Sequence, residues 1–162
     1  MATPITRSIR QVIFDGFVSE LLKVEAIQGS AFDFPILENI REARLPYAWV
    51  YPLPESFSDD EDQSTGMVHS ILNVGLEVVY RFEESDQHTI LAKGERILAD
   101  VQKQLHTYQN DSTRTWQGII TESQNDIQHL PLDDGPYGIV VMVWTVEHFR
   151  ARLDPDTQAV TN

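Results

Sequence analysis

Five histidines have the widest chemical range in this sequence, since histidine can ligate a metal or move a proton near neutral pH. They stand far apart, as His69, His88, His106, His129 and His148. A helix-borne zinc site needs two histidines four residues apart around a glutamate, and many other zinc sites need cysteine. Neither pattern occurs, and the chain has no cysteine. The histidines are therefore expected at the surface or at strand edges, and no metal or other cofactor is predicted.

Two acidic stretches offer carboxylates as a second kind of chemistry. The run at 59–62, followed by Gly66, partly matches a calcium-binding loop. The glycine falls one place late, and Ile71 stands where such a loop needs a bidentate carboxylate, so the oxygen cage would be incomplete. Asp133 and Asp134 could act as acid and base only in a pocket that shifts a pKa. Both stretches are expected to be solvated loops.

Motifs for nucleophilic catalysis and phosphate binding do not occur in the sequence. The glycines at 75, 94, 118 and 135 are isolated. None begins a phosphate-cradling loop that ends in Gly-Lys-Ser or Gly-Lys-Thr, and there is no Gly-x-Ser-x-Gly nucleophile turn. We therefore predict that the protein is not an enzyme.

Trp116 is the aromatic residue that we select as a candidate for binding. It lies between Thr115 and Gln117 on an expected edge strand, where an aromatic side chain can serve a contact between proteins. Trp49 and Trp144 lie in apolar runs and are expected in the core.

The clearest of the elements that must position these residues is the run from Met67 to Phe82. Every second residue from Leu72 is large and apolar, which is typical of a strand with one buried face. The run would span roughly 50 Å, whereas a common strand has about 5–6 residues. Such a strand either bends, with Gly75 as the natural place for a bulge, or projects from the body as an arm.

Two helices are predicted from apolar residues that recur at spacings of three and four. The first covers residues 5–26, with Thr3 as N-cap and Gly29 as the stop signal. The second covers residues 87–108, and Gly94 on its apolar stripe would allow close packing against a strand.

Further strands are predicted on both sides of the long one. Residues 36–40 could form a short edge strand, and 47–51 form a strand bounded by prolines. Residues 114–122 read as a strand that forms a hairpin with 137–149 across a long polar loop at 123–136. The last strand is apolar on both faces, which favours a central strand covered on both sides.

The order of these elements predicts an α+β fold. A mixed or antiparallel sheet of about four main strands would be packed by two helices in two layers, with a long strand or hairpin arm. Residues 1–153 are expected to form a single domain, and 154–162 a polar tail.

The net charge of −13 restricts the partners of the protein. Residues 1–54 hold five basic and six acidic groups, and residues 55–162 hold seven and nineteen. Binding to the nucleic-acid backbone needs clustered lysine and arginine, so DNA binding is not predicted. No apolar run reaches the roughly 20 residues of a membrane span, and we expect a soluble protein with no membrane contact.

The order of the parts resembles the tail terminator, or tail-completion, proteins of long-tailed bacteriophages, a group that overlaps with minor tail proteins. The resemblance covers roughly residues 5 to 153. It comprises an amphipathic N-terminal helix, the LPYAWVYP segment followed by Glu55, the long alternating strand, a helix with Ile97 to Val101, and a hairpin that closes on Tyr137 to Arg150. The acidic insert at 57–65 and the loop at 123–136 are longer than the family pattern.

The resemblance implies a structural virion protein. Members form a ring, generally of six copies, on the head-proximal end of the tail tube. The ring stops tube growth and offers a docking face to the neck. The implied partners are other copies of the chain, the tail tube protein and the neck or connector protein, with the tail sheath as a further candidate. The implied location is the tail–neck junction of the virion, after assembly in the host cytoplasm.

Exposure on the expected strands and loops selects candidates for the contacts between subunits or with tube and neck: Tyr47, Glu55, Arg81, Trp116, Gln117 and Phe149. Six copies would carry six times −13, or −78 formal charges. An acidic lumen would repel phosphates and let the genome pass without specific binding. The candidates for that lumen are Asp59, Asp60, Glu61, Asp62, Asp133 and Asp134.

Two alternative functions remain open at this point. One is a neck connector or head-closure protein of the same virion, which a different docking partner would reveal. The other is a small-molecule-binding or enzymatic α+β domain, which a pocket with convergent polar groups would support.

Overall fold

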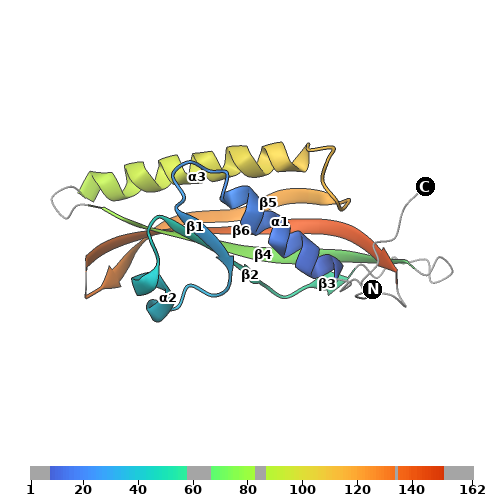
Figure 1. The fold of residues 1–162 in the computed structure, drawn as a ribbon, viewed down its shortest axis with the longest axis horizontal. Helices are drawn as coiled ribbons and strands as arrows, with labels where there is room; N and C mark the ends of the chain where they lie inside the picture. Colours follow the sequence, from blue (N-terminus) through green and yellow to red (C-terminus); the bar gives the residue numbers. More distant parts are fainter. Residues whose placement is uncertain (1–7, 58–66, 83–86, 134, 152–162) are drawn as a thin grey trace, which may run out of the picture.

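The computed structural model describes residues 8–57, 67–82, 87–133 and 135–151. Two helices, α1 (Ile9–Leu21) and α3 (Gln87–Gln109), lie on one six-stranded sheet, and a short helix, α2 (Leu37–Glu42), lies beside one end of it. The strands are β1 (Gly29–Phe32), β2 (Tyr47–Pro52), β3 (Ser56–Phe57), β4 (Met67–Arg81), β5 (Ile119–Leu132) and β6 (Gly135–Ala151). The predicted α+β class is confirmed (Figure 1).

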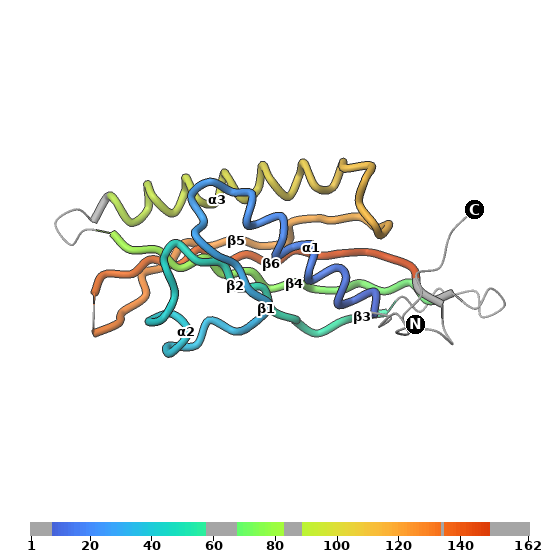
Figure 2. Tube along the Cα trace, viewed as in Figure 1, coloured from blue at the N-terminus to red at the C-terminus, as the bar shows by residue number. Residues whose placement is uncertain are grey.

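The sheet has the order β1-β2-β4-β6-β5, with β3 paired to β4 outside this path. Only the β1–β2 pair is parallel. All 15 residues of β4 pair with β6, from Met67 with Ala151 to Arg81 with Tyr137. Figure 2 shows these two strands side by side along the long axis of the molecule. The unusual length of β4 is therefore taken up by pairing with β6 of the same chain.

Gly75 does not form the expected bulge, because the β4–β6 register runs through it without a shift. Its role is to admit an aromatic ring, since a methyl group at this position would overlap the ring of Tyr51 on β2. The register shift of this sheet lies instead in β5, between Glu122 and Gln124.

One face of the sheet is covered by α1 and α3. Most even-numbered residues of β4 and β6, such as Leu76 and Met142, are buried there. Figure 1 shows α3 along the length of the molecule and α1 crossing the sheet beside it. Gly94 of α3 is buried, and a side chain there would meet Tyr80 and Ile127, so the expected close packing is confirmed.

The first helix is shorter than the predicted range of 5–26. Ser8 caps its first turn, because the side-chain oxygen accepts a hydrogen bond from the backbone N–H of Gln11 at 3.2 Å. The helix ends at Leu21, and tight turns then carry Val24 and Ile27 into the core. Gly29 opens β1 and does not cap the helix. The proposed N-cap at Thr3 lies outside the described residues.

The edge strand predicted at 36–40 is wrong, because this segment belongs to α2. The side-chain amide of Asn39 donates to the carbonyl oxygen of Phe34 at 3.0 Å and to Asp33 at 3.3 Å, which folds the segment back on itself. Ile40 is the buried residue of this helix, and it packs near Trp49.

The predictions of a strand at 114–122 and of a loop at 123–136 are also wrong. Residues 114–118 form the connection after α3, and β5 runs on from Ile119 to Leu132. The predicted hairpin with the last strand is confirmed, but its turn is short. The polar sequence of β5 is compatible with a strand because β5 lies at the edge of the sheet, with one face largely exposed.

Candidate functional site: the open face of the sheet

The second face of the sheet is covered at one end only. There α2 and its flanks pack on Trp49, Val79, Tyr137 and Ile139. Beyond this contact the odd-numbered residues of β6 are partly exposed, whereas the even-numbered residues are buried. The expectation that the last strand is covered on both sides therefore holds only near α2. We call the uncovered part of β4, β5 and β6 the open face.

The open face mixes apolar and acidic side chains. Ile119 is 57% exposed and Phe149 is 39% exposed, and Val141 and Val143 are partly buried along the same face. Apolar groups left in contact with water at the centre of a sheet are typical of a surface that binds another protein. The acidic side chains on this face are Glu77, Asp126 and Glu147.

Tyr51 and Glu77 mark the border between the open face and the α2 contact. The hydroxyl group of Tyr51 donates to the carboxylate of Glu77 at 2.8 Å, while the ring of Phe34 lies 5.4 Å from that of Tyr51. Burial raises the pKa of Tyr51, and the hydrogen bond to Glu77 raises it further. The phenol is therefore neutral at physiological pH and serves as a rigid contact.

His69 and Phe149 form a cross-strand pair at the far end of the open face. Their rings stack at 4.9 Å, and Nε2 of His69 lies 3.4 Å from a carboxylate oxygen of Glu147. Ile119 on β5 is opposite Glu147 in the β5–β6 register. This end therefore presents an aromatic and aliphatic surface beside one ion pair that forms when His69 is protonated.

The predicted contact residues on the strands are spread over the molecule. Phe149 lies on the open face. Tyr47 is half-buried beside Trp49, with ring centroids 4.6 Å apart. Arg81 lies at the other end of β4, where it donates to the hydroxyl of Tyr137 at 2.9 Å. Glu55 is turned inward: it accepts a hydrogen bond from Ser70 and lies 3.3 Å from Nε of Arg10.

Trp116 is buried, so the reason for selecting it as an exposed contact does not hold. It is only 2% exposed, and it lies in the connection after α3 instead of on an edge strand. Its ring N–H donates to the hydroxyl of Tyr108 at 3.0 Å, and the guanidinium of Arg114 lies 4.2 Å from its ring centroid. Gln117 is exposed in the same connection.

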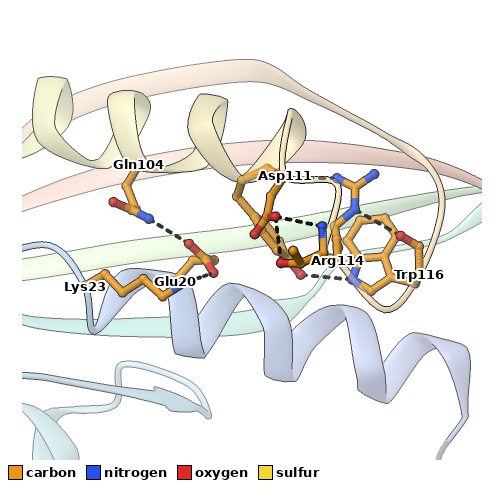
Figure 3. Close-up of polar contacts among 8 residues, drawn as sticks. Glu20, Lys23, Gln104, Asp111, Arg114 and Trp116 are labelled. Carbon is orange, nitrogen blue, oxygen red and sulfur yellow. Dashed lines mark hydrogen bonds and ion pairs between the residues drawn. The ribbon is translucent and has the colours of Figure 1, made fainter.

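A polar cluster around this connection fastens α1 to α3 (Figure 3). Glu20 of α1 is buried, and its carboxylate accepts hydrogen bonds from Lys23 at 2.5 Å and from Gln104 of α3 at 2.7 Å. The hydrogen bond to Glu20 raises the pKa of Lys23. Hydrogen bonds from Thr113 lower the pKa of Asp111. The sequence carries no local signal for the hydrogen bond between Glu20 and Gln104, because these residues are 84 positions apart and meet only when α1 packs against α3.

The acidic residues proposed for a lumen lie mostly outside the described residues. This applies to Asp59, Asp60, Glu61, Asp62 and Asp134. Asp133 is described and is exposed at the tip of the β5–β6 hairpin.

Two hollows of the surface are lined in part by charged or titratable side chains. One of about 660 Å³ lies between α3 and the turn before β1, and one of about 760 Å³ lies at the hairpin tip between Phe82 and Leu132. Within the described residues, no three histidine or carboxylate side chains are close enough to hold a metal ion. Arg96 and Asp100 line the first hollow, and His129 and Asp133 line the second.

Comparison with known proteins leaves the structure as the main guide to function. No protein-family model matches the chain, and no curated protein matches its sequence. None of the helices in the described part of the chain is both long enough and apolar enough to cross a membrane.

Proposed function

We propose that the protein is a structural component of the tail of a long-tailed bacteriophage. In this role six copies form a ring on the head-proximal end of the tail tube, which stops tube growth and docks the neck. The observation that supports this role is the open face: a long sheet has helices on one side, and its other side is uncovered over most of its length and exposes Ile119 and Phe149 at one end. A protein that acts as a monomer gains nothing from such a surface, whereas a ring subunit buries it.

The negative charge of the chain agrees with a structural role. The chain carries a net charge of −13, so a ring of six copies would repel the DNA that passes through it. Asp133 at the hairpin tip is exposed, where it can contribute to that field.

Native mass measurement and negative-stain imaging test this function, with the protein alone and mixed with purified tail tubes. We expect closed rings, or caps at one end of each tube only. Tubes grown without the protein serve as the control and should lack caps and vary in length. A chain that never binds tubes would overturn the terminator role. If that chain bound purified neck proteins instead, it would favour a neck connector.

A further inference from the structure

We propose that the open face of one copy is covered by the outer surface of α3 from the next copy. This inference rests on the proposed function, because it assigns the contact between neighbouring ring subunits. It would give each sheet a second helical layer, supplied by the neighbour. The occupant is thus a second copy of this chain, and the contact joins two different surfaces.

The lengths of the two surfaces agree. Helix α3 has 23 residues, which span about 34 Å at about 1.5 Å per residue. The part of β4 outside the α2 contact, from Met67 to Glu77, spans about 36 Å at about 3.3 Å per residue. Helix α3 can therefore lie along the whole open face.

The outer surface of α3 has the side chains that such a contact needs. Ala92 and Ala99 are exposed on the same side of α3 as Arg96 and Lys103, whereas the exposed Leu91 lies about 140° around the helix from Arg96 at about 100° per residue. Small residues allow the backbone of a helix to approach a sheet closely. The inner stripe of α3, with Val101 and Leu105, is already buried in its own subunit.

The charges of the two surfaces are complementary. The outer surface of α3 carries Arg96 and Lys103 beside the acidic residues Glu95 and Asp100, while Lys93 already donates to the backbone oxygen of Arg81 in its own subunit at 2.7 Å. The open face carries Glu77, Asp126 and Glu147. Arg96 and Lys103 form no ion pair with any part of the chain that the structure describes. Opposite charges steer the two surfaces together and set their orientation.

The outer edge of β5 is a poorer candidate for the contact because it is partly blocked. The backbone N–H of Ile120 donates to the side chain of Gln109 at 2.5 Å, and that of Ile127 donates to Asp126 at 2.9 Å. The register shift after Glu122 and the missing N–H of Pro131 interrupt the edge further. Contact between two open faces is also disfavoured, since it would bring acidic groups together.

Complementary charge reversal tests the contact. One variant carries Arg96→Glu and Lys103→Glu on α3, and the other carries Asp126→Lys and Glu147→Lys on the open face. Each variant alone should associate with itself at least about tenfold more weakly than the wild type, because like charges then face each other. An equal mixture should recover assembly, with the two variants alternating around the ring. Sedimentation and native mass measurement follow the self-association of each variant and the assembly of the mixture. Circular dichroism checks that each variant is folded.

Cross-linking gives a second measurement that does not depend on charge. The chain has no cysteine, so Ala99→Cys on α3 and Val143→Cys on the open face each introduce a single thiol. A short bismaleimide should join the two variants when they are mixed, and should join neither to itself. Ala99→Cys mixed with Glu38→Cys, on the exposed surface of α2, is the matched control and should remain unlinked.

The outcomes separate this inference from the proposed function. Wild-type protein that stays monomeric even at millimolar concentration, with no cross-link between positions 99 and 143, would overturn the inference. Assembly that the reversed variants support as well as the wild type would also overturn it, while caps on tail tubes would still support the terminator role. Assembly through the predicted contact without binding to tubes would support the inference and contradict the proposed function.

Discussion

The guanidinium of Arg114 contacts both the end of α3 and the connection that follows it. It donates to the backbone oxygens of Trp116 at 3.0 Å and Gly118 at 2.7 Å, and it lies 3.4 Å from the carbonyl oxygen of Tyr108. The last carbonyls of a helix lack partners within it, and a cation near them is favoured by the helix dipole. Arg114 thus adds to the C-terminal cap of α3, to which the side-chain amide of Asn110 also contributes by donating to the carbonyl oxygen of His106 at 3.1 Å.

We expect Arg114→Lys to lower the free energy of unfolding by about 1–3 kcal/mol, because lysine cannot reach several carbonyls at once or stack flat on Trp116. Urea titration followed by tryptophan fluorescence measures the loss. Arg96→Lys makes the same chemical change on the exposed surface of α3. It should change the free energy of unfolding much less, by about a few tenths of a kcal/mol. Equal effects of the two substitutions would contradict the capping role.

Among the elements, α3 and β4 could be predicted from the local sequence, whereas most of β5 and all of α2 could not. The helix was predictable because its apolar stripe has a clear period, and β4 was predictable from its alternation. The polar run of β5 after Glu122 was not, since a strand with one exposed face and a free edge needs few apolar residues. Helix α2 was missed because side chains of Asp33 and Asn39, instead of an apolar period, fold its segment.

Because α3 lies very close to the sheet at Gly94, we expect a glycine-to-alanine substitution there to change the stability in the direction opposite to the usual one. Replacing a glycine within a helix by alanine normally stabilises it, by about 0.5–1 kcal/mol. At Gly94 the added methyl group would lie 2.6 Å from both Tyr80 Oη and Ile127 Cγ2. Tyr80 cannot move freely, because its hydroxyl group donates to the carbonyl oxygen of Ile90 at 2.7 Å.

We therefore expect Gly94→Ala to destabilise the protein by about 1–3 kcal/mol, as overpacking does in other cores. Thermal unfolding measures the change. Ala99→Gly, on the exposed side of the same helix, should cost about 0.5–1 kcal/mol through helix propensity alone. A stabilised Gly94→Ala variant would show that α3 can shift away from Tyr80 without cost.

At the scale of the whole molecule, the candidate site could be predicted only in part. Phe149 was selected from the sequence and lies on the open face, whereas Trp116 was selected and is buried. Which strand face stays uncovered depends on where α2 lies, and the sequence carries no local signal for that. The acidic balance of the chain, in contrast, is a property of composition and required no structure.

The blocked edge of β5 predicts resistance to aggregation. Asp126→Ala with Pro131→Thr would leave one N–H without its acceptor and add another, which makes the edge a better template for a strand from another molecule. We expect this variant to aggregate faster just below its unfolding temperature, as measured by light scattering. Asp126→Asn removes the same charge but keeps an acceptor for Ile127, and it should behave like the wild type. Equally rapid aggregation of both variants would assign the effect to charge.

The full-length pairing of β4 with β6 has a mechanical consequence. The two strands run antiparallel through the middle of the sheet and match over all 15 residues of β4. A pull along their common axis stretches every hydrogen bond of the ladder at the same time, whereas a pull across it would open the bonds one after another. The molecule is therefore stiffest along its long axis, the direction in which a tensile load would have to shear the whole ladder before the two strands could part.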